Sequence, residues 1–265
     1  MDIPIIELVA EGIKCRIPLS KQGKIFSLVN IGICNFNCLY CCKGGNAKTK
    51  SSHLLPCANY IGIDDIYSFI DQQTQEGHLI KISGGEPTLI WPDILDIMSY
   101  CKKNKVYVSC DTSGWNTERS IAVAEIADQM AIDLKGPPKY VSKITQTSLE
   151  LCWTNVIKSI ETWAKITTLL EIRTPIFNFT TLDDLTLLAQ YIPQKAFWVL
   201  RRFITSEEDS NIFLSHNKYP DWLISPEHSF VNALATELLN IFPDLYGRII
   251  LLQENPRSTY GEIIY

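Results

Sequence analysis

The chain has 265 residues, 46% of them hydrophobic and 20% charged, with a formal net charge of −5. This length allows one α/β barrel or two small domains, and the composition excludes a disordered or fibrous protein. The acidic balance argues against binding a nucleic-acid polymer, since that depends on clustered cations. No apolar run is long enough to span a membrane and the acidic start does not resemble a signal peptide, so we expect a cytoplasmic protein.

The predicted elements alternate between strands and helices. Strands are expected at residues 24–32, 78–83, 105–110, 129–134, 168–173 and 196–203. Amphipathic helices are expected at 63–76, 92–104, 117–127, 153–165 and 181–192. This alternation implies right-handed βαβ units, so we predict an α/β fold built as an open, partial (β/α)6 TIM-like barrel.

No shift in composition marks a linker, and residues 1–265 are therefore expected to form a single domain. The barrel core covers about residues 12–203. Residues 204–265 form a C-terminal extension with a predicted helix at 225–242 and a strand at 248–252. The least regular stretch, 204–224, is interpreted as an insertion or a lid over the barrel.

The chain has nine cysteines, and four of them lie within nine residues. In a reducing compartment such clustering indicates metal ligands rather than disulfides. Cys34, Cys38 and Cys41 have the spacing C-x3-C-x2-C, and three thiolates suit an iron–sulfur cluster or zinc. A structural zinc site needs a fourth ligand, which Cys42 or Cys57 offers. Because Cys42 directly follows Cys41, it is poorly placed to bind the same ion. An iron–sulfur cluster is therefore favoured.

Polar loops follow the predicted strands, at the end of a parallel sheet where ligands bind. They are "SGGEP" at 83–87, "CDTSG" at 110–114, "DLKGPP" at 133–138 and "RTP" at 173–175. Glycines allow the main chain to approach a ligand closely. Each loop alone is explained as an ordinary turn, but their alignment with the cysteine cluster favours a binding site.

The cysteine triplet with Tyr40 inside it, followed by Gly84–Pro87, resembles the radical S-adenosylmethionine (SAM) superfamily. Within it, the chain is similar to the glycyl-radical-enzyme activating enzymes, including activators of anaerobic ribonucleotide reductase. Further matches are Gly23-Lys24, Asp111-Thr112-Ser113-Gly114, Asp133-Leu134-Lys135 and Arg173-Thr174. The resemblance covers about residues 12–203. It departs from the activators at Cys42, where they usually have histidine, and at Ser113, where they have asparagine.

The resemblance implies a single [4Fe–4S] cluster on Cys34, Cys38 and Cys41, with SAM bound to the open iron. It places Gly84, Gly85, Glu86 and Pro87 at the amino end of the methionine moiety. It places Asp111, Ser113, Asp133 and Lys135 near that moiety or an associated monovalent cation, and Tyr40 near the adenine. An electron from a donor such as flavodoxin or ferredoxin would cleave SAM to a 5′-deoxyadenosyl radical, which abstracts hydrogen from the substrate.

Three hypotheses for function follow. The first is an enzyme, an oxidoreductase or a lyase, that passes the radical to a glycine of a glycyl radical enzyme. The second is the same chemistry on a small molecule such as a nucleoside or a 7-deazapurine base, as in queuosine-type metabolism. The third is a non-catalytic zinc or iron–sulfur binding module.

The sequence offers fewer candidates for contacts with the substrate than for contacts with SAM. Trp115 follows the "DTSG" loop, and Arg173 ends a strand where an anionic substrate would bind. Arg201 and Arg202 are further candidates for such an anion. Because side chains alternate along a strand, at most one of these two faces the barrel interior. Cys101, Cys110, Trp153, Trp163 and Trp198 are interpreted as core residues.

Overall fold

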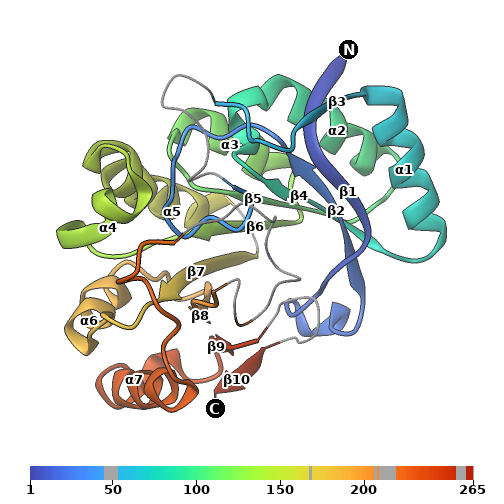
Figure 1. Cartoon of the computed structure of the whole chain (residues 1–265). Helices are drawn as coiled ribbons and strands as arrows, with labels where there is room; N and C mark the ends of the chain where they lie inside the picture. The colour runs from blue at the N-terminus through green and yellow to red at the C-terminus, as the bar shows by residue number, and fades with distance from the viewer. Residues whose placement is uncertain (45–52, 167–168, 206–207, 209–218, 255–260, 265) are drawn as a thin grey trace.

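The computed structural model describes residues 1–44, 53–166, 169–205, 208, 219–254 and 261–264 (Figure 1). Within these residues the strands form one sheet in the order β10-β9-β8-β7-β6-β5-β4-β2-β1-β3. Seven neighbouring strands run parallel: β2 (Ile25–Ile31), β4 (Leu79–Gly84), β5 (Val108–Thr112), β6 (Gln129–Asp133), β7 (Leu170–Ile176), β8 (Phe197–Arg202) and β9 (Ile249–Leu252). Antiparallel strands flank them: β1 (Asp2–Lys14), β3 (Asn59–Gly62) and β10 (Glu262–Ile264).

The helices lie on the outer face of this curved sheet, as Figure 1 shows. They are α1 (Ile63–Gln75), α2 (Trp91–Lys103), α3 (Thr117–Ile126), α4 (Pro138–Thr145), α5 (Asn155–Ile166), α6 (Leu182–Ala189) and α7 (His228–Ile241). The two edge strands of the sheet, β3 and β10, are not paired with each other within the part of the chain described. The predicted α/β fold with an open, partial barrel is therefore confirmed.

The sequence-based prediction missed β1, α4 and the two short edge strands β3 and β10. The long strand β1 pairs with both β2 and β3, but two irregularities in its register to β2 break the strict alternation by which strands are found. The short helix α4 begins at Pro138, inside a Gly-Pro-Pro run that reads as a turn. Proline is accepted there because the first helical residue needs no intrahelical N–H bond.

The hydrophobic core lies between the sheet and the helices. Trp163, Trp198, Cys101 and Cys110 are fully buried in it, as the sequence predicts. The indole N–H of Trp198 donates to the Thr174 hydroxyl at 2.9 Å, so this large ring is buried without an unpaired donor.

The C-terminal extension continues the barrel. The strand β9 pairs in parallel with β8, and α7 packs against α6 and β8. The predicted lid at 204–224 lies mostly outside the described residues. No helix in the described part of the chain is long and apolar enough to cross a membrane.

Candidate functional site

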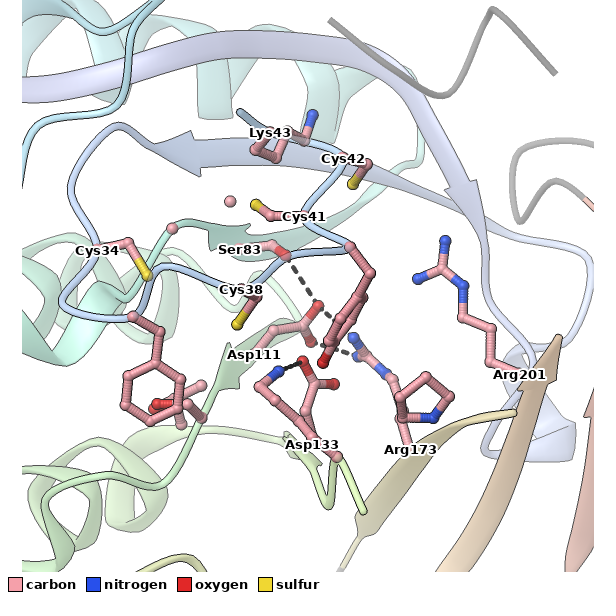
Figure 2. A pocket seen from close by; sticks show the side chains of 18 of the residues that line it. Cys34, Cys38, Cys41, Cys42, Lys43, Ser83, Asp111, Asp133, Arg173 and Arg201 are labelled. Atoms are coloured by element: carbon pink, nitrogen blue, oxygen red, sulfur yellow. Dashed lines mark hydrogen bonds and ion pairs between the residues drawn. The ribbon is translucent and has the colours of Figure 1, made fainter. Parts of the chain in front are cut away.

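A cavity of about 290 Å³ opens at the carboxyl ends of the parallel strands. Figure 2 shows the cysteine loop on one side of it and charged side chains of the barrel interior on the other. Most of the residues predicted from the sequence line it: Cys34, Cys38, Tyr40, Cys41, Gly84, Gly85, Glu86, Asp111, Ser113, Asp133, Lys135 and Arg173. Pro87 and Trp115 do not line the cavity.

The cysteine loop follows β2 and is fastened at both ends by main-chain bonds. The Cys34 N–H donates to the His53 carbonyl at 2.8 Å, and the Leu39 N–H donates to the Ile144 carbonyl at the end of α4 at 2.8 Å. Cys38 is 9% exposed and packs with Phe36 and other apolar side chains. The unpredicted helix α4 therefore helps to hold the loop in place.

The three thiols of the C-x3-C-x2-C motif line the same cavity and could hold a cluster. Among the described residues, no three Cys, His, Asp or Glu side chains converge as the ligands of one ion would. In a four-iron cluster each cysteine binds a different iron, so the sulfurs stand apart around it. Cys34, Cys38 and Cys41 all line the cavity, and Cys42 also lines it whereas Cys57 does not.

Burial and charge act in opposite directions on the Cys38 thiol. Burial raises the pKa of this thiol well above its usual value, and the ammonium of Lys135 offsets only part of that rise. A thiolate ligand must be deprotonated, so Lys135 favours the form that binds metal.

The glycine loop lies so close to β2 and to the chain that follows it that side chains would not fit. A Cβ on Gly85 would lie 2.1 Å from the Ile33 carbonyl oxygen. Gly84 has a φ of +98°, and its Cβ would lie 2.6 Å from the Ile31 nitrogen. The N–H of Gly85 donates to the Ile31 carbonyl at 2.8 Å. Both glycines are therefore required for the loop to line the cavity with bare main chain.

Replacing Gly84 with alanine is expected to distort this loop. The matched control is Gly77→Ala, because Gly77 also has a positive φ, +84°, but a Cβ there would meet nothing within 4 Å. Backbone strain alone costs about 1–2 kcal/mol at each position. The clash with Ile31 is expected to add about 1–3 kcal/mol for Gly84→Ala only. Urea unfolding measures both variants, and equal losses of stability would contradict this account of the loop.

Glu86 ties the glycine loop to the "DTSG" loop. Its buried carboxylate accepts bonds from the Thr88 hydroxyl at 2.5 Å, the Thr112 hydroxyl at 2.6 Å and the Ser113 hydroxyl at 2.6 Å. The main-chain N–H groups of Thr88 and Ser113 also donate to it. This carboxylate is thus occupied by hydroxyls and amides of its own chain, and it holds the two loops together.

Trp115, predicted as a substrate contact, is placed outside the cavity. Its indole N–H donates to the Thr88 hydroxyl at 2.9 Å, and the Arg119 guanidinium lies over its ring, 5.5 Å from the centroid. The sequence does not predict this position of Trp115, because nothing in it indicates that the ring points toward the short helical turn Pro87–Ile90.

Tyr40, Asp133 and Lys135 form a second group on the cavity wall. The Lys135 ammonium donates to the Asp133 carboxylate at 2.6 Å and lies 5.8 Å from the centroid of the Tyr40 ring. Burial raises the pKa of the Tyr40 phenol well above its usual value, so the ring stays neutral. Burial would lower the pKa of Lys135, but Asp133 and other partners raise it well above its usual value.

A network of buried charges fills the barrel interior behind this wall (Figure 2). Arg173 binds Asp111 through two bonds of 2.9 and 2.7 Å and Glu171 through one of 2.6 Å. Lys81 donates to Asp111 at 2.8 Å, and Arg16 donates to Glu171 at 2.9 Å. The network therefore neutralises Asp111, which the family resemblance places near the methionine moiety or a monovalent cation, with the chain's own cations.

These ion pairs predict a loss of stability in acid. Burial would raise the pKa of Glu171, but Arg16, Arg173 and Lys81 lower it to about 2. Arg173 and Lys81 likewise hold the pKa of Asp111 well below its usual range against burial. Both pKa values are lower in the folded chain, so their contribution is complete above the unfolded values near 4 and is lost as the pH falls toward 2.

Urea unfolding of the cluster-free protein between pH 7 and pH 2 measures this effect. We expect the free energy of unfolding to fall most steeply below pH 4, and to fall less steeply in Glu171→Gln. A wild-type profile that is flat below pH 4 would contradict the network.

Comparisons with known proteins agree with the site. Residues 30–192 match the radical SAM superfamily, which is more than half of the chain. The chain belongs to the radical SAM superfamily. This match confirms the family assignment made from the cysteine and glycine motifs. Membership implies an enzyme that uses SAM and a [4Fe–4S] cluster.

One curated relative of this radical SAM chain comes from Methanocaldococcus jannaschii and is provisionally named a glycyl-radical enzyme activating enzyme. It is 32% identical over 104 residues, which cover 38% of this chain and 40% of the relative. The chain thus matches less than half the length of that relative.

Two solved structures share the fold. The Streptococcus suis protein SuiB bound to S-adenosylmethionine has a TM-score of 0.62 at 13% identity, over 84% of this chain and 48% of SuiB. TYW1 with a lysine-pyruvate adduct bound has a TM-score of 0.51 at 15% identity, over 81% of this chain and 72% of TYW1.

Proposed function

We propose that this radical SAM enzyme activates a glycyl radical enzyme by abstracting hydrogen from a glycine of that partner. The match to the archaeal relative, whose name states this activity, carries the proposal. Further support comes from the motifs around Cys34, Gly84, Asp111 and Lys135, which resemble those of the activators and line one cavity. A single domain holds all of them.

In this proposal Cys34, Cys38 and Cys41 hold one [4Fe–4S] cluster, and the fourth iron is left for SAM. When bound, the cluster supplies the electron that cleaves SAM, and flavodoxin or ferredoxin would supply that electron to it. The protein's own task is to bind and orient SAM.

Three groups of the cavity wall suit SAM. The bare main chain at Gly84 and Gly85 lets the methionine end approach closely. The positive charge of Lys135 suits the methionine carboxylate, and Asp133 holds that ammonium in place at 2.6 Å. The ring of Tyr40, also on the cavity wall, offers a flat apolar face to the adenine.

A second candidate is the same chemistry on a small molecule. The barrel interior favours this second candidate, because Arg16, Lys81 and Arg173 line the same cavity as the cysteine loop. Such a charged interior suits a polar ligand that enters the barrel, such as a nucleoside or a deazapurine base.

Transfer of deuterium distinguishes the two candidates. The reduced holoenzyme is incubated with SAM and a glycyl radical enzyme from the same organism whose glycines carry deuterium at the α-carbon. We expect deuterium in the 5′-deoxyadenosine and a glycyl radical signal in electron paramagnetic resonance. If 5′-deoxyadenosine forms without deuterium and without that signal, the glycyl activity is rejected and the small-molecule candidate remains.

A further inference from the structure

Arg201 is a cation inside the barrel that the buried network leaves unpaired. It lines the cavity from β8, and Figure 2 shows its guanidinium directed into that space, on the side opposite Cys34. It makes no ion pair with any residue of the described ranges. Its partners in the neighbouring strands are Pro175 on β7 and Leu252 on β9, so no carboxylate stands beside it.

The carboxylates of Glu171 and Asp111 are already bound to other side chains. Glu171 accepts bonds from Arg16, Arg173 and Gln129. Asp111 accepts bonds from Lys81 and Ser83 as well as both bonds from Arg173. Arg16, Lys81 and Arg173 thus already share these two carboxylates, and Arg201 adds a positive charge beside them that neither carboxylate pairs.

Arg16 carries a second, independent observation, a buried donor without an acceptor. It lines the same cavity and is only 5% exposed, and its Nη1 donates to Glu171. Its Nε–H is buried with no hydrogen-bond partner, a costly state for a guanidinium. Burial lowers the pKa of Arg16, Glu171 raises it, and Arg173 and Arg201 lower it further by repulsion. Arg16 and Arg201 are thus close enough to repel each other.

The neighbouring Arg202 shows how a purely structural arginine looks in this fold. It is 3% exposed and donates to the carbonyls of Gln253 at 2.9 Å and Pro226 at 3.1 Å, and it also pairs with Glu208. Arg201 has none of these partners. Both arginines line the cavity, contrary to the expectation from strict alternation along the strand, but among the described residues only Arg202 is tied to neighbouring groups.

We infer that Arg201 and Arg16 bind a carboxylate or phosphate group of the molecule that donates hydrogen to the enzyme. An anion between them would relieve their repulsion and give the Arg16 Nε–H an acceptor. The methionine carboxylate of SAM belongs at the cysteine and glycine loops, across the cavity. The inference rests on the proposed function in one respect, that the hydrogen donor enters the SAM cavity.

Binding of simple anions to the holoenzyme tests this site. Inorganic phosphate and acetate are titrated separately into the reconstituted enzyme with SAM, at an ionic strength fixed with chloride, and the heat is measured. We expect saturable binding of at least one anion, at one site per chain. Arg201→Gln is expected to weaken it about 10-fold or more, since a charge-assisted bond is lost. The control Lys165→Gln removes the same charge from the exposed end of α5 and is expected to change nothing.

Thermal unfolding gives a second readout that a structural role would not produce. Because Arg201 has no partner and repels Arg16, Arg201→Gln is expected to keep or raise the Tm without anion. The added anion is expected to raise the Tm of the wild type more than that of the variant. Phosphate binding would indicate a phosphate group on the hydrogen donor, and acetate binding alone would indicate a carboxylate.

Two results would overturn the inference. One is that neither anion binds saturably to the wild type. The other is that Arg201→Gln binds as tightly as the wild type. Neither result depends on where the radical goes, because no radical chemistry is needed for the titration. Failure of the glycyl activity is seen separately, as 5′-deoxyadenosine without deuterium.

Discussion

Cys38→Ala is expected to abolish the cleavage of SAM, and to do so by removing the cluster rather than by unfolding the chain. Cys38 lies in the middle of the loop that the main-chain bonds at Cys34 and Leu39 fasten to the barrel. Losing a group that only supports a metal ligand lowers affinity or activity about 10- to 100-fold, so losing a ligand itself is expected to cost more than about 100-fold. Iron and sulfide content and the yield of 5′-deoxyadenosine measure the effect.

The chain offers two matched controls for this variant. Cys42 lines the same cavity and is adjacent to Cys41, whereas Cys57 lies outside the cavity. We expect Cys42→Ala and Cys57→Ala to retain their iron and most of their activity. If all three variants lost activity equally, the ligand set Cys34, Cys38 and Cys41 would be wrong.

Asp111→Asn is expected to destabilise the fold by about 3–5 kcal/mol, because it breaks a buried ion network. The substitution keeps the shape of the side chain and removes its charge. It leaves the Lys81 ammonium, which is 2% exposed, and the Arg173 guanidinium without their shared carboxylate. Buried charges that lose their partner cost more than the pair contributed. Urea unfolding of the cluster-free protein measures the loss.

An exposed ion pair serves as the control for Asp111→Asn. Lys102 is 44% exposed and pairs with Asp128 at 2.5 Å on the protein surface. Lys102→Gln is expected to cost less than about 1 kcal/mol, since water screens such pairs. A similar loss in both variants would show that the barrel interior is as well solvated as the surface, and the network would then have no special role.

The sequence predicts the parallel core because each of its strands carries a compact apolar run followed by a polar loop. The strand at 78–83 and the "SGGEP" loop illustrate this, and the structure has β4 at Leu79–Gly84. The motif residues are found because they follow those strands directly. β1 was missed because its bulges break the period on which the prediction depends.

The charged interior could be predicted only in part. Lys81, Asp111 and Glu171 alternate with apolar residues in their strands, but the sequence does not say which face of each strand points inward. Arg16 lies 155 residues from its partner Glu171, and nothing local links them. The register of β8 against β7 and β9, which places Arg201 between Pro175 and Leu252, also cannot be read from the sequence. Contacts between distant strands therefore decide this part of the site.

The release of 5′-deoxyadenosine from SAM tests the central claim most directly. The protein is reconstituted anaerobically with iron and sulfide, reduced with dithionite and incubated with SAM. We predict that it binds iron and sulfide and forms 5′-deoxyadenosine, and that Cys38→Ala forms none. A wild-type protein that binds zinc in place of iron and sulfide, and forms no 5′-deoxyadenosine, would contradict the assignment of radical SAM chemistry to this site.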